Sequence, residues 1–216
     1  MTTRPEELQT KTLGEKKPCI VLDTNIWRAQ LLLRNPLGAA LVFAVRSSGG
    51  AIGLPEVISD EILKQLTKAG QEAADLVRRG FGILEKLVGS RSAYELPGAE
   101  QIHQSIMEQF KEIAPFLHTV PFTLEHAKAA LSRVNGETPP NGPKNQQFKD
   151  SAIWEAILEL AQTFRVYFVT SDKGFFEGKD PRKGLAAILQ RETGEKGVTV
   201  PSVPIMMRHL LHVNLM

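Results

Sequence analysis

Pro18-Cys-Ile-Val-Leu-Asp-Thr-Asn25 is the stretch of sequence that decides the fold. Its apolar part is short and unbroken, which is typical of a strand that is buried on both faces of a parallel sheet. The run ends at Asp23, Thr24 and Asn25, residue types that favour turns and helix caps. The stretch therefore predicts a buried strand with a carboxylate directly after its last residue.

Similar apolar runs recur over 51–54 and 166–170, and shorter extended stretches over 116–120 and 198–200. Between them the apolar residues repeat at helical spacing. The expected helices cover 26–34, 36–45, 57–66, 72–87, 99–113, 123–134, 150–161 and 184–191. Strands that alternate with helices predict the α/β class, as a three-layer α/β/α arrangement around a mostly parallel sheet.

The chain of 216 residues fits one domain with an elaboration. Residues 1–17 lack periodicity and are expected to be a flexible leader, followed by a single domain over 18–216 with a helical insert at about 72–113. The stretch 135–147 is rich in Pro, Gly and Asn and predicts a long loop of the kind that is functional or disordered. An apolar helix is expected at the C-terminus, where 205–211 could cover the sheet edge or pair with another subunit.

Composition excludes several classes of protein. A formal net charge of +2 is too small to indicate nucleic-acid binding by itself. The single Cys19 rules out an internal disulfide and a cysteine-based zinc site. No apolar run approaches the roughly 18 residues that a membrane span needs, and the polar N-terminus does not resemble a signal peptide. A cytoplasmic protein with no membrane partner is therefore expected.

Four carboxylates stand where a parallel sheet would bring them together. Asp23 and Asp172 each follow a predicted strand, Glu61 lies one turn into the helix after the second strand, and Asp150 opens another helix. A strand-end acid can also be a helix cap, so either Asp alone would carry little weight. Convergent carboxylates repel one another and are tolerated mainly around a divalent cation. Oxygen ligands favour Mg²⁺ or Mn²⁺, and such a site supports phosphodiester hydrolysis.

Four segments then resemble, in order, the acidic motifs of PIN-domain nucleases. They are Val21-Leu-Asp-Thr-Asn25, Leu54-Pro-Glu-Val-Ile-Ser-Asp-Glu-Ile62, Phe148-Lys-Asp-Ser-Ala-Ile-Trp-Glu155 and Phe168-Val-Thr-Ser-Asp-Lys-Gly-Phe175. The pattern looks most like the larger PIN-like proteins rather than the short toxin type, because of the Pro-Pro loop before the third acid and the helical insert. The resemblance implies a metal-dependent endoribonuclease, RNA-processing or toxin-like, whose catalytic and metal-binding quartet is Asp23, Glu61, Asp150 and Asp172.

The resemblance also implies roles for neighbouring residues. Thr24 or Asn25 would orient Asp23 or a bound water, and Thr170 or Ser171 would shape the corner at the fourth acid. Asp60 competes with Glu61, and the position directly before the apolar Ile62 favours Glu61. An RNA substrate needs cations around the acids. The candidates are Arg133, Lys149 and Lys173, whereas Glu155 is expected to be a solvated helix acid. The resemblance also implies a possible homodimer and a possible antitoxin-like protein partner.

Two other functions remain open at this point. A phosphatase or phosphotransferase could use Asp23 as its nucleophile, but such enzymes usually carry a second Asp two residues later, where this chain has Asn25. A non-catalytic interaction module could retain the fold without the chemistry. The complete acidic quartet argues against such a loss of catalytic residues.

Overall fold

The computed structural model describes residues 16–90, 92, 95–196 and 198–199. Residues 1–15 of the leader expected over 1–17, and the expected C-terminal helix, lie outside this part of the chain. Five strands form one sheet in which every neighbouring pair is parallel. They are β1 (Pro18–Leu22), β2 (Ala51–Pro55), β3 (Leu117–Val120), β4 (Arg165–Val169) and β5 (Val198–Thr199), in the order β3-β2-β1-β4-β5.

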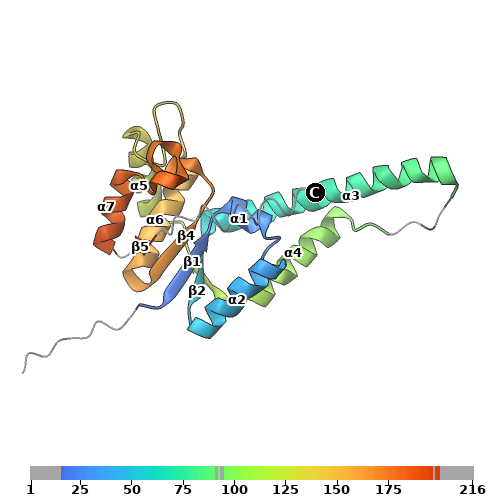
Figure 1. Ribbon diagram of the computed structural model, residues 1–216, viewed down its shortest axis with the longest axis horizontal. Coiled ribbons are helices and arrows are strands. Elements are labelled where there is room, and N and C mark those ends of the chain that lie inside the picture. Colours follow the sequence, from blue (N-terminus) through green and yellow to red (C-terminus); the bar gives the residue numbers. More distant parts are fainter. Residues whose placement is uncertain (1–15, 91, 93–94, 197, 200–216) are drawn as a thin grey trace, which may run out of the picture.

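Within the described residues, seven helices surround this sheet, so the predicted α/β class and three-layer arrangement are confirmed. They are α1 (Thr24–Ala29), α2 (Pro36–Ser48), α3 (Glu56–Val88), α4 (Ala99–Ile113), α5 (Leu124–Asn135), α6 (Phe148–Thr163) and α7 (Ala187–Lys196). Figure 1 shows α5, α6 and α7 on one side of the sheet and α1, α2 and α4 on the other. Three 3₁₀ turns follow β4, over Lys173–Phe175, Glu177–Lys179 and Pro181–Lys183, and a fourth, over Ala114–Phe116, precedes β3.

The core lies between the sheet and α6. The strands contribute Cys19, Val21, Ile52, Val166 and Phe168, and α6 contributes Ile153, Trp154 and Ile157, each at most 1% exposed. This follows from the sequence, because the strands of a parallel sheet that is covered on both faces carry apolar side chains on both sides. In the described part of the chain, no helix combines the length and the apolarity that crossing a bilayer requires.

Two of the predicted helices have different bounds. The helix expected over 26–34 ends at Ala29, and Leu31, Leu32 and Leu33 follow with φ of 46°, 57° and 64°. Left-handed backbone is unfavourable for leucine, and the burial of Leu32 and Leu33 (3% exposed each) offsets that cost. The turn also needs Gly38, because a Cβ there would lie 2.4 Å from the Leu33 Cα.

The helices expected over 57–66 and 72–87 are one continuous α3. Gly70 lies between them and does not end the helix, since a glycine inside a helix costs only about 1 kcal/mol relative to alanine. The second half of α3 and all of α4 make up the residues of the predicted insert. In Figure 1 the end of α3 projects well beyond the sheet.

Candidate active site: a carboxylate cluster

The cluster lies where the strand order of the sheet reverses. β1 pairs with β2 on one side and with β4 on the other, and the chain reaches β2 and β4 by crossovers on opposite faces. Ligands bind at the carboxyl ends of the strands at such a switch point. Asp23 follows β1 and Asp172 follows β4, and the Asp23 amide donates to the Val169 carbonyl at 3.0 Å. The ends of the two strands are therefore tied together beside both acids.

Asp23 is the most buried of the four acids. It is 5% exposed, and each of its carboxylate oxygens has a donor. Oδ1 accepts from the Thr24 amide at 2.7 Å, and Oδ2 accepts from the Thr170 hydroxyl at 2.7 Å. The same hydroxyl oxygen accepts from the Asp172 amide at 2.9 Å. Thr170 thus connects the first acid to the backbone of the fourth.

Glu61 reaches the cluster from the first turns of α3. Its Oε2 accepts from the Thr24 hydroxyl at 3.2 Å, and its Oε1 accepts from the Gln65 side chain at 2.8 Å. The Lys149 ammonium lies 3.9 Å from Oε1. The adjacent Asp60 is exposed on another face of the helix, so Glu61 is the acid of this pair that faces Thr24.

Asp150 is the acid with the largest resolved change in pKa. Burial, followed by the negative charges of Asp172, Asp23 and Glu61, raises the pKa of Asp150 from 3.8 to about 7. Burial is also the main reason that the pKa of Asp23 is raised, although its hydrogen bonds from Thr170 and Thr24 oppose the effect. The four carboxylates therefore act on one another electrostatically, although they come from four separate segments.

The donor set suits a hard divalent cation. Among the described residues, no three His, Cys, Asp or Glu side chains already form a compact metal-binding group. The cluster nonetheless supplies only carboxylate oxygens, and burial together with like charge disfavours full ionisation without a counter-ion. Asp23, Asp150 and Asp172 would hold Mg²⁺ or Mn²⁺ directly or through water, with Glu61 at the edge of the group.

The long loop over 136–147 is ordered and contributes a residue that sequence reasoning missed. Asn141 is buried, donates to the Ser151 hydroxyl at 2.8 Å and accepts from the Gln147 amide at 2.6 Å. The Gln147 side chain, directly before α6, then donates to Asp172 Oδ2 at 3.5 Å. A glutamine in a loop carries no periodic signal, so only the three-dimensional arrangement identifies it.

Gly174 is a second residue that the sequence did not single out. Its amide donates to Asp172 Oδ1 at 2.6 Å, which fixes the orientation of that carboxylate. A Cβ at this position would lie 2.5 Å from Gln147 Oε1 and 2.8 Å from the Pro140 carbonyl oxygen. The loop and the turn after β4 can approach this closely because residue 174 lacks a side chain.

The other predicted residues divide into two groups. Thr24 and Thr170 hold Glu61 and Asp23, whereas Asn25 and Ser171 are exposed. Lys149 and Lys173 are also exposed and adjoin Asp150 and Asp172 in sequence. Cations in these positions are accessible to a ligand that approaches the carboxylates.

Arg133, for which a role in substrate binding was predicted, is engaged in ion pairs in the structure. Its side chain is 11% exposed and forms ion pairs with Glu155 of α6 and Glu192 of α7, the latter at 2.9 Å. Glu192 also accepts from the Trp154 indole at 2.7 Å. The guanidinium therefore takes part in a network of ion pairs that joins α5, α6 and α7. The expectation that Glu155 is a solvated acid was wrong for the same reason.

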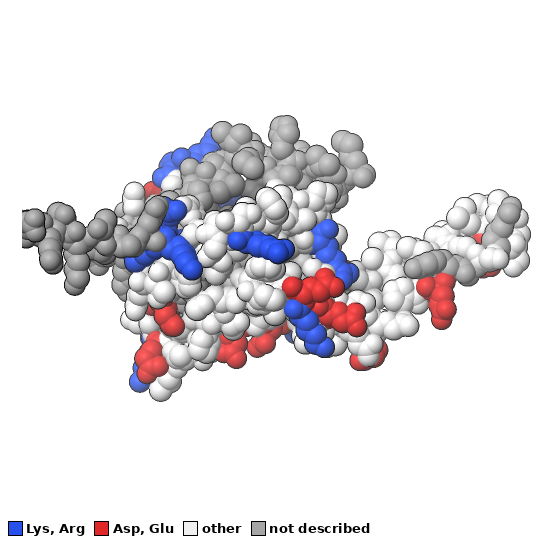
Figure 2. Space-filling view, turned by 90° about the horizontal axis from the view of Figure 1, so that it is seen from below, with Lys and Arg blue, Asp and Glu red and all other residues white. Residues whose placement is uncertain are grey.

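The molecular surface carries charges of both signs. On the face in Figure 2, Lys and Arg side chains form separate patches and do not make a continuous basic band. Acidic side chains gather beside basic ones where the body joins the projecting end of α3. A ligand with phosphates that approached this face would meet separate cations rather than a uniformly positive surface.

A comparison with known protein families gives a match whose residues include the whole carboxylate cluster. A family model described as PIN domain matches residues 20–175, which include all four carboxylates. No curated protein and no solved structure matches the chain.

Proposed function

Since the chain belongs to the PIN domain family, we propose that it is a metal-dependent nuclease that hydrolyses RNA phosphodiester bonds at the carboxylate cluster. The observation that carries the proposal is the convergence of the carboxylates at the switch point of the sheet, where the Thr24 hydroxyl contacts Glu61 and the Thr170 hydroxyl joins Asp23 to the backbone of Asp172. Crowded, partly buried carboxylates are costly unless a cation neutralises them. The choice of RNA over DNA is supported by resemblance to the family's ribonucleases.

Each part of the cluster has a task in this proposal. Bound Mg²⁺ or Mn²⁺ supplies a water of lowered pKa and stabilises charge on the phosphate oxygens. Asp23 is held in one orientation by Thr170 and by the Thr24 amide, so it needs little rearrangement to act as a ligand. Lys149 is 66% exposed beside Glu61 and is placed to contact a substrate phosphate.

The phosphatase alternative is less well supported by the geometry of Asp23. A nucleophilic carboxylate must present a free oxygen to the phosphorus atom. Both oxygens of Asp23 already accept short hydrogen bonds, and the residue is 5% exposed. This arrangement suits a fixed ligand better than a nucleophile.

The test uses end-labelled single-stranded and hairpin RNA with Mn²⁺, with Mg²⁺ and with chelator. We expect cleavage that depends on the metal and falls at least about 100-fold in Asp23→Asn and Glu61→Gln. Asp60→Asn is the matched control, because it removes a neighbouring carboxylate that is exposed outside the cluster. Its rate should equal that of the wild type.

Three outcomes would overturn parts of the proposal. Cleavage of DNA but not RNA would retain the nuclease and change the substrate. Turnover of a phosphomonoester, with no cleavage of either nucleic acid, would instead indicate a phosphatase. If RNA is bound but never cleaved with either metal, the chain is a binding module on a PIN fold.

A further inference from the structure

Two phenylalanines expose their rings at the same edge of the sheet as the carboxylates. Phe122 follows β3 by two residues, and Phe148 is the first residue of α6, two residues before Asp150. Their exposed fractions are 38% and 39%. Across the described residues, exposed phenylalanine side chains occur at three positions, and the third is Phe43 on α2. Single exposed apolar side chains are ordinary, whereas two that adjoin each other beside a candidate active site indicate a ligand.

The two rings are in contact but do not cover each other. Their centroids are 6.3 Å apart and their planes are at 86°, which is an edge-to-face arrangement. His126 of α5 packs against Phe122, with the ring centroids 6.5 Å apart and the planes at 27°. These contacts hold both phenylalanine rings and leave part of each accessible. Phe122 and Phe148 therefore form one supported aromatic surface, here called the aromatic pair.

Hydrogen bonds fix the segment that carries Phe122. The Phe122 amide donates to Glu56 Oε2 at 2.7 Å, which joins the residues after β3 to the first turn of α3. The Thr123 hydroxyl accepts from the His126 amide at 3.2 Å and caps α5. The Nε2 atom of His126 lies 2.9 Å from Glu159 Oε2 on α6. A surface that is held in this way loses little conformational freedom when a ligand binds.

The aromatic pair is continuous with the carboxylate cluster through Lys149. This lysine lies between Phe148 and Asp150 in the first turn of α6, and its ammonium is 3.9 Å from Glu61 Oε1. The strand order places the residues after β3 two strands away from those after β1, which is about 10 Å. A nucleic-acid strand with one phosphate at Lys149 can therefore reach the aromatic pair with an adjacent base.

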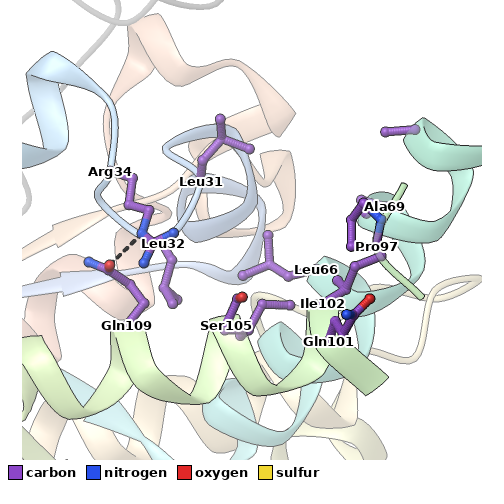
Figure 3. A pocket seen from close by; sticks show the side chains of 13 residues that line it. Leu31, Leu32, Arg34, Leu66, Ala69, Pro97, Gln101, Ile102, Ser105 and Gln109 are labelled. Atoms are coloured by element: carbon purple, nitrogen blue, oxygen red, sulfur yellow. Dashed lines mark hydrogen bonds between the residues drawn. The ribbon is translucent and has the colours of Figure 1, made fainter. Parts of the chain in front are cut away.

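A pocket further along α3 does not offer such a surface. It has a volume of about 390 Å³ and lies between α3 and α4. Figure 3 shows Leu66 and Ala69 across from Ile102, with the Arg34–Gln109 hydrogen bond at one end. None of the described residues that line this pocket is aromatic. Because a base stacks on an aromatic ring, the aromatic pair suits a base and the pocket does not.

We propose that Phe122 and Phe148 form a stacking platform for an unpaired base of the RNA, next to the bond that the carboxylates cleave. The proposal rests on the proposed function, because it takes nucleic acid as the ligand. Unpaired bases stack on aromatic side chains, whereas the bases inside a duplex are covered by their neighbours. Every base has a π-face, so the platform holds the strand without reading its sequence.

The first test measures the binding of a fluorescein-labelled single-stranded RNA oligonucleotide by fluorescence anisotropy. The full chain carries Asp23→Asn, which removes cleavage from the assay. We expect Phe122→Ala and Phe148→Ala each to raise the Kd about 5–100-fold, the effect of one lost contact between a base and an aromatic ring. Phe43→Ala is the matched control, because Phe43 is 71% exposed on α2, outside the aromatic pair. Its Kd should equal that of the parent chain.

Two conservative variants show whether the ring itself is needed. Phe148→Tyr retains an aromatic ring and should bind the oligonucleotide as the parent chain does. Phe148→Leu retains an apolar side chain without a π-face and should bind as weakly as Phe148→Ala. Equal binding by Phe148→Leu and the parent chain would show that the position supplies apolar contact alone, and would overturn the stacking platform.

A further test distinguishes stacking from a general loss of affinity. Abasic nucleotides are placed at successive positions of the oligonucleotide. One position should weaken binding to the parent chain most, and the same change should have little further effect on the double variant Phe122→Ala/Phe148→Ala. A fully paired RNA duplex should bind both proteins with the same Kd, because its bases do not reach the platform. A purely structural effect of the substitutions would weaken the binding of every RNA alike.

Failure of the platform can be told apart from failure of the nuclease. An unchanged Kd for single-stranded RNA in both alanine variants would exclude the platform, even if the chain cleaves RNA, and would assign the exposed rings to another ligand such as a protein. Equal losses for single-stranded and duplex RNA would also exclude it. RNA that is bound through the aromatic pair but never cleaved by the wild type would remove the nuclease alone. Circular dichroism of each variant checks that the fold is intact.

Discussion

The crowding of the carboxylates makes a sharp prediction about Asp150→Asn. The pKa of Asp150 rises from 3.8 to about 7 on folding, so the metal-free folded protein retains a proton that the unfolded chain has released. Between these pH values, the unfolded state binds fewer protons, and the stability of the wild type falls as the pH rises. The carboxamide introduced by Asp150→Asn carries no charge in either state, and the substitution therefore removes this loss.

The size of the effect follows from the shift. A pKa change of this size corresponds to at most about 4 kcal/mol. The four acids titrate as a coupled set, and Asp150 keeps some access to water. We therefore expect Asp150→Asn to stabilise the metal-free protein by about 1–2 kcal/mol above pH 7. For a domain of this size that is a rise in Tm of about 2–8 °C.

The assay is thermal unfolding in chelator from pH 4 to pH 8.5, followed by Mn²⁺ titration at pH 8. The Tm difference between Asp150→Asn and the wild type should be near zero at pH 4, increase between pH 4 and pH 7, and stay constant above pH 7. Mn²⁺ should raise the Tm of the wild type, because it binds only the folded state, and should raise that of the variant much less. Asp60→Asn serves as the control. A variant that is less stable at pH 8, or a Tm difference independent of pH, would refute the electrostatic coupling.

Three further variants test the surroundings of the cluster. Thr170→Val removes the hydrogen bond that lowers the pKa of Asp23, so protons should compete better with the metal for that carboxylate. We expect the Mn²⁺ affinity measured by calorimetry to fall about 10–100-fold at pH 7. The difference in affinity from the wild type should become smaller at higher pH. An unchanged affinity would contradict this role. Gly174→Ala forces a Cβ toward the Pro140 carbonyl. We expect it to slow cleavage about 10–100-fold and to lower the free energy of urea unfolding by about 1–3 kcal/mol. Equal rates would show that the turn adapts. Arg133→Met leaves Glu155 and Glu192 without their cation and should lower the free energy of urea unfolding by about 3 kcal/mol, without altering the metal dependence of cleavage. A loss of RNA binding in a variant of unchanged stability would instead support a substrate-binding role for Arg133.

The position of the cluster could be read from the sequence because it depends on local patterns. Apolar runs that stop at Asp23 and Asp172 mark strand ends, and parallel strands place those ends at one edge of the sheet. The first turns of the helices that follow begin near the same edge, which brings Glu61 within reach. Periodicity was enough to place the strand ends and the helix starts, whereas the choice of Glu61 over Asp60 rested on the resemblance to the second acidic motif of the family.

The errors arose where a residue's role depends on a distant partner. Glu155 was expected to be solvated, and its ion-pair partner Arg133 lies 22 residues earlier in the chain, on a different helix. The left-handed run after α1 depends in the same way on the close approach of Gly38. The exposure of apolar side chains such as Leu76 and Leu87 at the projecting end of α3 could not be recognised either, since an amphipathic pattern identifies an apolar face but not what covers it.

The network around Arg133 and the carboxylate cluster both act on α6. Repulsion at the N-terminus of α6, where Asp150 lies, favours displacement of that end of the helix from the sheet. The Ser151 hydroxyl holds the first turn through Asn141, and one turn later Glu155 is paired with Arg133. The apolar side of the helix is anchored in the core by Ile153 and Ile157. The charge network is therefore remote from the carboxylates and still bears on their arrangement, because it helps to hold α6 in place while Asp150 lies among like charges.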